Sequence, residues 1–174
     1  MRRAESLMIE FLKTYKNYDP AAKSYLEIAI LYPGPKAILI HRVAHRCYQV
    51  KLFFMARLFA EISRWMTGIE IHPGAQLGSR LVIDHGVGVV IGETAVIGND
   101  CIIFHGVTLG GMKFDPVKRH PTVGNKVLIG TGAKVLGPIT IGDNAKIGAN
   151  AVVTKDIPPG ATVVAPASEI RIKH

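Results

Sequence analysis

The chain has 174 residues, 48% of them hydrophobic, which is enough to bury a core in one or two domains. Its 21 basic and 13 acidic residues give a net charge of +8, which favours a polyanionic partner such as a phosphate-rich cofactor. The basic residues are dispersed, and no nucleic-acid motif, cleavable leader or membrane-spanning apolar run is present. We therefore expect a cytoplasmic protein with neither a nucleic-acid nor a membrane partner.

The first part of the chain, residues 1–68, is predicted to form an α-helical N-terminal domain. Asp19 followed by Pro20 is typical of a helix N-terminus, and this helix is expected to run to about Leu31. The cluster YPGP at 32–35 then interrupts the helical pattern.

Two further helices are predicted over residues 36–49 and 52–66, where apolar residues recur at helical spacing, and Gly68 is a natural stop. Cys47 lies in the first of these stretches and Cys101 in the repeat that follows. Each is expected to be a reduced thiol in the core.

Aliphatic residues recur every six positions in the second part of the chain, with two shifts of phase. The repeated positions are Ile71, Leu77, Ile83, Ile91, Ile97, Ile103, Leu109, Val123, Ile129, Val135, Ile141, Ile147 and Val153. Smaller residues stand four positions after many of them, at Ala75, Ala95, Cys101, Val127, Ala133, Ala145 and Ala151. A six-residue period is the signature of a parallel β-helix, whose interior both sets would share. We therefore predict a mainly β protein, with a β-helix over residues 69–164.

One segment, residues 110–122, does not follow the repeat and carries Lys118, Arg119 and His120. It is predicted to protrude as a loop with a function of its own. Residues 165–174 leave the repeat and are expected to form a C-terminal tail. The flat faces of a β-helix favour close packing of several copies, and threefold association is the simplest symmetric solution.

Histidines are the first candidates for chemistry. His85 lies at the first shift of phase, where it is either a catalytic base, since a neutral imidazole can take a proton from a hydroxyl, or a surface histidine. A base would need a carboxylate to hold its tautomer. Asp84 is one candidate, and Glu70 is another because it lies 15 residues earlier, close to one coil turn. His41 and His45 lie four apart on a helix without a third ligand, so structural roles are favoured over a metal site.

The blocks DHGVGVVIGET (84–94) and KRHP (118–121) occur in an order and spacing that make the chain resemble serine acetyltransferases. With the flanking repeats and the upstream stretch DPAAKSYLEIAILYPGPKAILIHRVAHRCY, the resemblance covers about residues 19–164. It implies a left-handed parallel β-helix and transfer of acetyl from acetyl-CoA to the L-serine hydroxyl, the first step of cysteine synthesis from serine. These motifs contain no Cys or Ser nucleophile, which favours direct attack over an acetyl-enzyme.

The resemblance also implies roles for single residues. His85 is the general base, and Glu70 orients it in place of an aspartate. Four residues are implied to hold the two charged ends of serine, namely Asp19 and Asp84 for its ammonium group and Arg119 and His120 for its carboxylate.

Acetyl-CoA is implied to lie along the coil surface between neighbouring subunits, and no metal is expected. Gly111 matches a backbone donor close to the reacting thioester. The late coil residues that are candidates to meet the coenzyme are Thr131, Gly132, Ala133, Lys134, Lys146 and Ala149.

Several segments depart from the family pattern. Residues 112–116 and 165–168 differ from the usual loop and C-terminal sequences. The chain also lacks the N-terminal extension that joins trimers of relatives into hexamers and the tail that docks the sulfhydrylase. We therefore expect a homotrimer that forms no tight complex with the sulfhydrylase.

Other functions on the same scaffold would require other residues. Another hexapeptide-repeat O- or N-acetyltransferase, with a sugar or antibiotic acceptor, would keep the base and the coenzyme site but would not need Arg119. A zinc carbonic anhydrase would need three convergent histidines, and no close third histidine follows His120 because position 125 is Asn. A noncatalytic trimeric scaffold would have no use for the basic loop.

Overall fold

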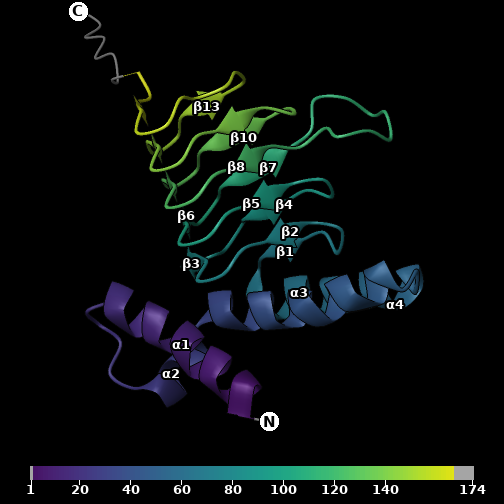
Figure 1. Cartoon of the computed structure of the whole chain (residues 1–174), viewed down its shortest axis with the longest axis vertical. Helices are drawn as coiled ribbons and strands as arrows, with labels where there is room; N and C mark the ends of the chain where they lie inside the picture. Colours follow the sequence, from purple (N-terminus) through teal and green to yellow (C-terminus); the bar gives the residue numbers. More distant parts are fainter. Residues whose placement is uncertain (1, 167–174) are drawn as a thin grey trace, which may run out of the picture.

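The computed structural model describes residues 2–166, with side chains from residue 10 onward. Four helices form a layer at the base of the molecule, and short parallel strands are stacked above them in a column (Figure 1). Of the predicted tail, only residues 165 and 166 fall within the described part of the chain, and its last residues lie outside it.

The first two helices begin and end at other residues than predicted. Helix α1 spans Arg2–Tyr18, and α2 spans Tyr25–Leu31. The prediction that Asp19 caps the second helix is wrong. The cap is Ser24, whose hydroxyl accepts the N–H of Glu27 while the Glu27 carboxylate accepts the N–H of Ser24. This reciprocal capping box satisfies two backbone donors, which the isolated Asp-Pro signal could not do.

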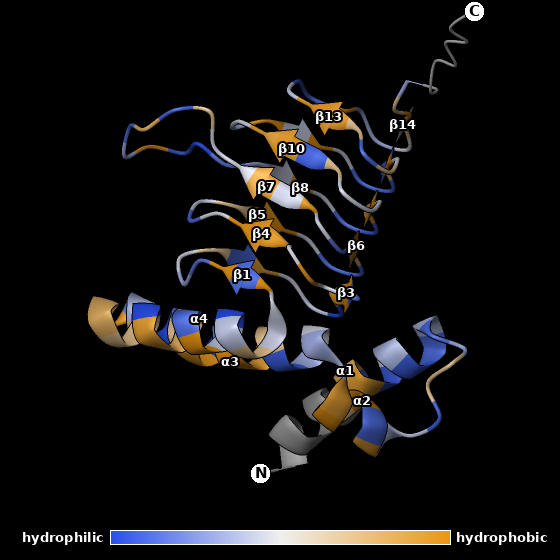
Figure 2. Ribbon diagram, turned by 180° about the vertical axis from the view of Figure 1, so that it is seen from behind, coloured by the Kyte–Doolittle hydropathy of each residue, from blue (hydrophilic) through white to orange (hydrophobic). Residues whose placement is uncertain are grey.

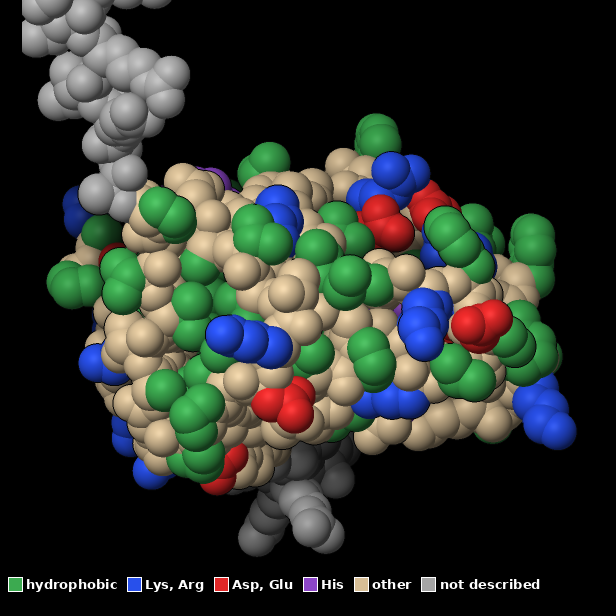
Figure 3. Space-filling model, turned by 90° about the horizontal axis from the view of Figure 1, so that it is seen from above, with side chains coloured by type: hydrophobic (Ala, Val, Ile, Leu, Met, Phe, Trp, Pro, Cys, Tyr) green, Lys and Arg blue, Asp and Glu red, His purple; other side chains and the backbone are tan. Residues whose placement is uncertain are grey.

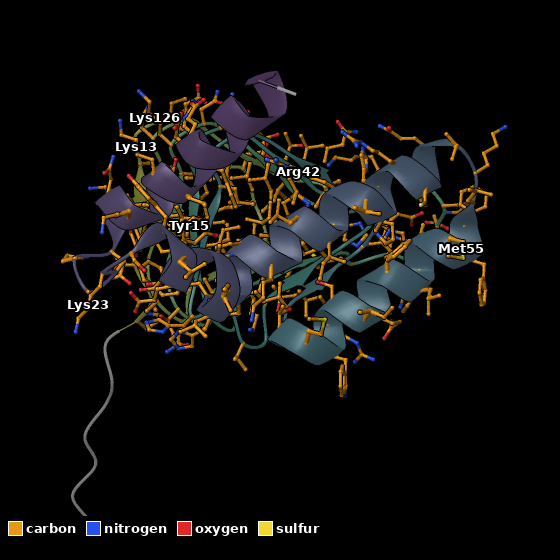
Figure 4. All side chains as sticks on the ribbon, turned by 90° about the horizontal axis from the view of Figure 1, so that it is seen from below. Lys13, Tyr15, Lys23, Arg42, Met55 and Lys126 are labelled. Atoms are coloured by element: carbon orange, nitrogen blue, oxygen red, sulfur yellow. The ribbon has the colours of Figure 1, made fainter. Side chains whose placement is uncertain are left out.

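Helices α3 (Pro33–Gln49) and α4 (Phe53–Thr67) run side by side across the base (Figure 4). The proline cluster ends α2, as predicted. The next helix was predicted to begin at residue 36, but α3 already begins at Pro33, because a proline fits the first helical position, where no N–H is needed. Gly68 ends α4 in the left-handed conformation with φ of 69°, as predicted.

The helical layer docks on the column at strand β3 (Val82–Asp84). A Cβ atom on Gly34 of α3 would lie 2.3 Å from the carbonyl oxygen of Ile83, so this close approach requires glycine. The buried hydroxyl of Tyr15 in α1 accepts the N–H of Ile83 at 2.9 Å. Both contacts hold the helices against the strand that leads into the DHG block.

The strands form three parallel sheets, which the chain visits in rotation. The first sheet contains β1 (Glu70–Ile71), β4 (Val90–Ile91), β7 (Thr108–Gly110), β10 (Lys134–Leu136) and β13 (Val152–Val153). The second contains β2 (Gln76–Leu77), β5 (Val96–Ile97), β8 (Thr122–Val123) and β11 (Thr140–Ile141). The third contains β3, β6 (Ile102–Phe104), β9 (Leu128–Ile129), β12 (Lys146–Ile147) and β14 (Thr162–Val163). Each coil is therefore one turn of a three-sided prism.

The repeated aliphatic residues fill the interior of this prism. All of them from Ile71 to Val153 are buried except Leu77, which is partly exposed, and the smaller residues four positions on are buried as well. The strands accordingly carry strongly hydrophobic residues around one continuous core (Figure 2). The prediction of a parallel β-helix behind a helical N-terminal region is confirmed.

Between β7 and β8 the chain leaves the column as a long loop over residues 111–121, which projects to one side (Figure 1). Seen from above, Lys and Arg side chains are scattered over the surface rather than gathered in one patch (Figure 3). Cys101 is a buried free thiol, whereas Cys47 is only half-buried, so the prediction of a core thiol holds for the former. Within residues 2–166, no helix combines the length and the apolar character that crossing a bilayer requires.

Candidate active site

His85 lies where the chain turns from the third sheet into the first, an edge that we call the histidine edge. Its backbone is left-handed, with φ of 58°, and its side chain is 72% exposed. The Nε2 atom lies 3.8 Å from Oδ2 of Asp84, and the ring meets that of His105, one coil above, edge to face at 5.7 Å. An exposed imidazole beside a half-buried carboxylate can act as a general base.

The helical layer adds hydrogen bonds to the acidic groups at this edge. The hydroxyl of Tyr18 donates to Asp84 at 3.2 Å, and burial followed by the Asp84 charge raises the pKa of Tyr18 to about 12. Asp19 accepts the hydroxyl of Tyr32 at 2.6 Å, and this bond lowers the pKa of the Asp19 carboxyl. The charge of His85 contributes to the same shift, so Asp19, Asp84 and His85 share one electrostatic environment.

Arg119 lies at the opposite edge of the first sheet, where the chain turns into the second sheet, an edge that we call the arginine edge. Its Nη2 atom donates to Oε2 of Glu93 at 2.8 Å, and Nη1 donates to the carbonyl of Asp115 in the loop at 3.2 Å. The hydroxyl of Tyr48 in α3 donates to the other oxygen of Glu93 at 3.1 Å. The guanidinium is thus held from both sides, by its own loop and by the coil below.

His120 packs into the arginine edge beside Arg119. Its Nδ1 atom accepts the N–H of Thr94 at 3.2 Å, which leaves Nε2 to carry the proton of the neutral ring. Burial, with a smaller contribution from Arg119, lowers the pKa of His120. A Cβ atom on Gly92 would lie 2.1 Å from this ring, so glycine is required for the packing. Gly111 is adjacent, because its ideal Cβ position is 3.4 Å from Nε2 of His120.

Glu70 does not lie beneath His85, so that expectation is wrong. It pairs with Val90, 20 residues further on, because the first shift of phase lengthens this coil by two residues. The charge of Glu70 acts instead on Arg64 and His72. Within one chain, it is the carboxylate of Asp84 that comes within 4 Å of His85 among the described residues, at 3.8 Å.

The coenzyme candidates divide between several places. Thr131 and Gly132 lie on the histidine edge above His105, whose carbonyl accepts the N–H of Gly132 at 2.9 Å. The methyl group of Ala133 is fully buried in the coil, so its side chain is not available to a ligand. The ammonium group of Lys134 donates to the carbonyl of Gly106.

Two candidates stand on the outer surface of the upper coils. Lys146 is exposed in the third sheet, and Ala149 is exposed at the turn that follows β12. The residues implied to act together therefore lie on two edges that the first sheet separates. Among residues 10–166, no three His, Cys, Asp or Glu side chains gather as a metal site would require.

Similarity to known proteins identifies the family. A family model described as bacterial transferase hexapeptide (six repeats) matches residues 120–155. The serine acetyltransferase of Helicobacter pylori strain 26695 is 56% identical over 146 residues, which cover 84% of this chain and 85% of that protein. This chain belongs to the serine acetyltransferase family. The prediction of an acyltransferase of this family from the DHGVGVVIGET and KRHP blocks is confirmed.

Solved structures of the serine acetyltransferase family share the fold. The Neisseria gonorrhoeae enzyme in complex with serine has a TM-score of 0.89 and 40% identity, covering 98% of this chain and 70% of that one. The Brucella abortus enzyme in complex with coenzyme A has a TM-score of 0.89 and 38% identity, covering 96% and 67%. The likeness therefore includes both the helical layer and the β-helix.

Sequence reasoning missed three residues that shape the candidate site in this chain. Glu93 and Thr94 stand at the end of the DHGVGVVIGET block, and they hold Arg119 and His120 through hydrogen bonds. Tyr48 comes from a helix far away in the sequence and carried no local signal. The first two could have been found by asking which groups in the quoted block would face the basic loop.

Proposed function

We propose that this chain transfers the acetyl group of acetyl-CoA to the hydroxyl of L-serine, giving O-acetyl-L-serine and CoA. The observation that carries the proposal is the exposed His85 beside Asp84, together with Arg119 and His120 on the other edge of the same sheet. Membership of the serine acetyltransferase family and the serine-bound and coenzyme-bound neighbours support both substrates. The reaction would be the first step of cysteine synthesis in the cytoplasm.

The imidazole of His85 takes the proton of the serine hydroxyl as the oxygen attacks the thioester carbon. A C–O bond forms, the carbonyl π electrons move to the oxyanion, and their return breaks the C–S bond. The imidazolium then gives its proton to the departing thiolate, so that CoA leaves as the thiol. General-base catalysis of this kind contributes about 10²–10⁴-fold. The N–H of Gly111 is proposed to donate to the oxyanion.

Serine is a zwitterion, and the two edges carry opposite charges that match it. Asp84 and Asp19 are proposed to hold the ammonium group, since both keep free lone pairs beside their tyrosine partners. Arg119 and the Nε2–H of His120 are proposed to hold the carboxylate. Glu93 neutralises Arg119 while serine is absent, and a bound carboxylate would share the guanidinium with it.

We propose that the catalytic unit is a homotrimer. The histidine edge and the arginine edge flank the first sheet, so a threefold axis facing this sheet would set the histidine edge of one copy against the arginine edge of the next. In that arrangement, Glu70 of one copy could orient His85 of its neighbour, which the register does not allow within a chain.

The coenzyme is proposed to follow the histidine edge upward from His85. Thr131, Gly132 and Ala149 would meet the pantetheine, and Lys146 would meet phosphates. Lys134, whose ammonium group is bonded to Gly106, would have to exchange that bond for a coenzyme contact. The expectation that the chain forms no tight complex with the sulfhydrylase rests on its C-terminal residues, which lie outside the described part of the chain.

The activity is tested by thiol release from acetyl-CoA with a panel of amino acids and sugars as acceptors. L-Serine should be the preferred acceptor by a wide margin. A sugar or an aminoglycoside as the best acceptor would replace the proposal with the other acetyltransferase class.

A further inference from the structure

A pocket of about 870 Å³ opens between α3 and the first coil, below the arginine edge. Its lining includes Arg42, Arg46 and Lys51, together with His41 and His45, and none of its lining residues is acidic. Neither Arg119 nor His85 belongs to the lining, but Tyr48 does, and its hydroxyl donates to the Glu93 carboxylate that holds Arg119, so the pocket adjoins the arginine edge. Such a concentration of positive charge in a concave surface favours an anion.

These cations have no acidic partner among residues 10–166. The ion pairs there involve Arg57, Arg64, Arg80 and Arg119, and none of them includes Arg42, Arg46 or Lys51. Arg42 lies between α1 and α3 (Figure 4), where its guanidinium stands over the ring of Phe11 at 5.5 Å. Arg46 and Lys51 therefore offer their charges to whatever enters the pocket.

His41 also lines the pocket, next to these cations. Its side chain is only 4% exposed, both ring nitrogens are buried without a close hydrogen-bond partner, and the backbone of His72 and Ala75 lies near enough to act on the pKa of the ring. Burial, followed by the nearby His45, lowers the pKa of His41 to about 4, so the ring is neutral and has one N–H to donate.

Both ring nitrogens of the neighbouring His45 form hydrogen bonds to residues other than His41. The Nδ1 atom of His45 lies 2.7 Å from the carbonyl oxygen of Pro73 and donates to it, and its Nε2 atom accepts from the amide of Gln49 at 2.9 Å. The two rings stack at 5.6 Å without a hydrogen bond between them. The two histidines therefore leave Arg46 and Lys51 as the groups that can hold a ligand in the pocket.

We propose that this pocket binds a tetrahedral oxyanion, a phosphate or sulfate group, through Arg46 and Lys51. The oxyanion brings several acceptors and a charge of about −2 to a site that has donors and positive charge and no acid of its own. The pocket has room for more than a single ion, so both a free oxyanion and the head group of a phosphomonoester fit this chemistry.

Isothermal titration with inorganic phosphate and with glycerol 3-phosphate, on the full chain in a buffer without phosphate or sulfate, tests the proposal. The double variant Arg46→Gln, Lys51→Gln should weaken binding about tenfold or more, because hydrogen bonds to charged groups are lost. The matched control Lys13→Gln, Lys126→Gln removes two charges that do not line the pocket, one in α1 and one in the turn between β8 and β9, and should bind as the wild type does. Tighter binding of the ester indicates a phosphorylated metabolite, whereas equal binding indicates the free ion, and both agree with the proposal.

Imidazole NMR of the wild-type protein provides a readout that does not depend on a variant. Phosphate should shift the ring signals of His41 and raise its pKa, since the anion stabilises the imidazolium. Unchanged His41 signals would overturn the proposal. So would phosphate binding that survives in the Arg46, Lys51 double variant but is lost in Arg119→Gln, because the anion would then occupy the serine carboxylate site. Neither measurement requires acetyl transfer, so failure of the proposed function would leave this result standing.

Discussion

His85 has the exposure that a general base needs, and its backbone conformation explains how. A left-handed residue with φ of 58° turns the side chain out of the regular wall at the shift of phase. Tyr18 and Asp84 then connect the edge to the helical layer. The chemistry thus depends on a local irregularity of the repeat.

Replacing this base tests the mechanism at the scale of one residue. His85→Ala should lower kcat by about 10² or more, because only the proton transfer is removed. Binding of acetyl-CoA, measured by titration without serine, should stay close to that of the wild type. A variant with nearly full turnover would exclude His85 as the base.

Arg119 should determine the affinity for serine rather than for the coenzyme. Arg119→Lys should raise the KM for serine about tenfold or more, because a point charge cannot reproduce a two-pronged grip on a carboxylate. The KM for acetyl-CoA should change little. An equal rise in both constants would indicate that the loop binds the phosphates of the coenzyme instead.

The lowered pKa of His41 predicts that the free energy of unfolding of the protein falls in acid. The folded pKa of about 4 lies below the usual 6.5, so the unfolded chain binds more protons as the pH falls from about 7 to 4, and the folded state is destabilised in that range. Between pH 7.5 and 5 the loss is on the order of 2 kcal/mol from this residue. Urea unfolding of wild type and His41→Gln in acetate and Tris buffers should show a smaller acid loss in the variant. Parallel pH curves would mean that His41 titrates normally.

At the scale of elements, the docking of α3 on β3 determines where the acidic groups of the helical layer meet the coil. Gly34 allows the contact, and Tyr15 fastens α1 to the same strand. The junction between helix and repeat is therefore part of the site as well as of the core.

Gly34→Ala should weaken this junction. The added Cβ would meet the carbonyl oxygen of Ile83, which cannot move without disturbing the strand, and overpacking of this kind costs about 1–3 kcal/mol. Urea unfolding should show that loss, while the exposed Val43→Ala on the same helix should change stability by less than about 0.5 kcal/mol. Equal stability of the two variants would show that the junction tolerates a side chain.

At the scale of the whole molecule, the main question is how the histidine edge and the arginine edge come together in one site. One sheet separates them, so a single copy presents half of the charge pattern that serine needs on each side. Exposed apolar side chains, including Phe54 and Trp65 of α4, lie at the base of the same copy and also favour association.

Mixing two inactive variants tests whether the site lies between copies. His85→Ala and Arg119→Gln, dissociated together and reassembled in equal amounts, should recover about a quarter of the wild-type activity. Three quarters of random trimers are mixed, and each mixed trimer has one intact site of three. Light scattering on the mixture should give a mass near three chains. Activity that stays at the level of the separate variants would place the whole site in one copy, and a mass near six chains would contradict the trimer.

The sequence by itself determined the six-residue repeat, the helices that precede it and the chemical groups of the candidate site. A six-residue period leaves only one arrangement that buries Ile71 through Val153, so local pattern and global fold agree. Ser24 and Glu27 also have the spacing of a capping box, and Asp19 does not cap the helix because its carboxylate accepts the N–H of Ala21 in its own turn and the hydroxyl of Tyr32.

Only the tertiary structure decided which groups meet. The spacing in the sequence predicted Glu70 to lie about one coil turn below His85. The two extra residues at the phase shift pair it with Val90 instead, because the register of two strands depends on the length of every turn that connects them. Tyr48 reaches Glu93, the partner of Arg119, from a helix through a contact that no local pattern encodes. Side chains brought together by packing across the fold leave no spacing in the sequence by which to find them.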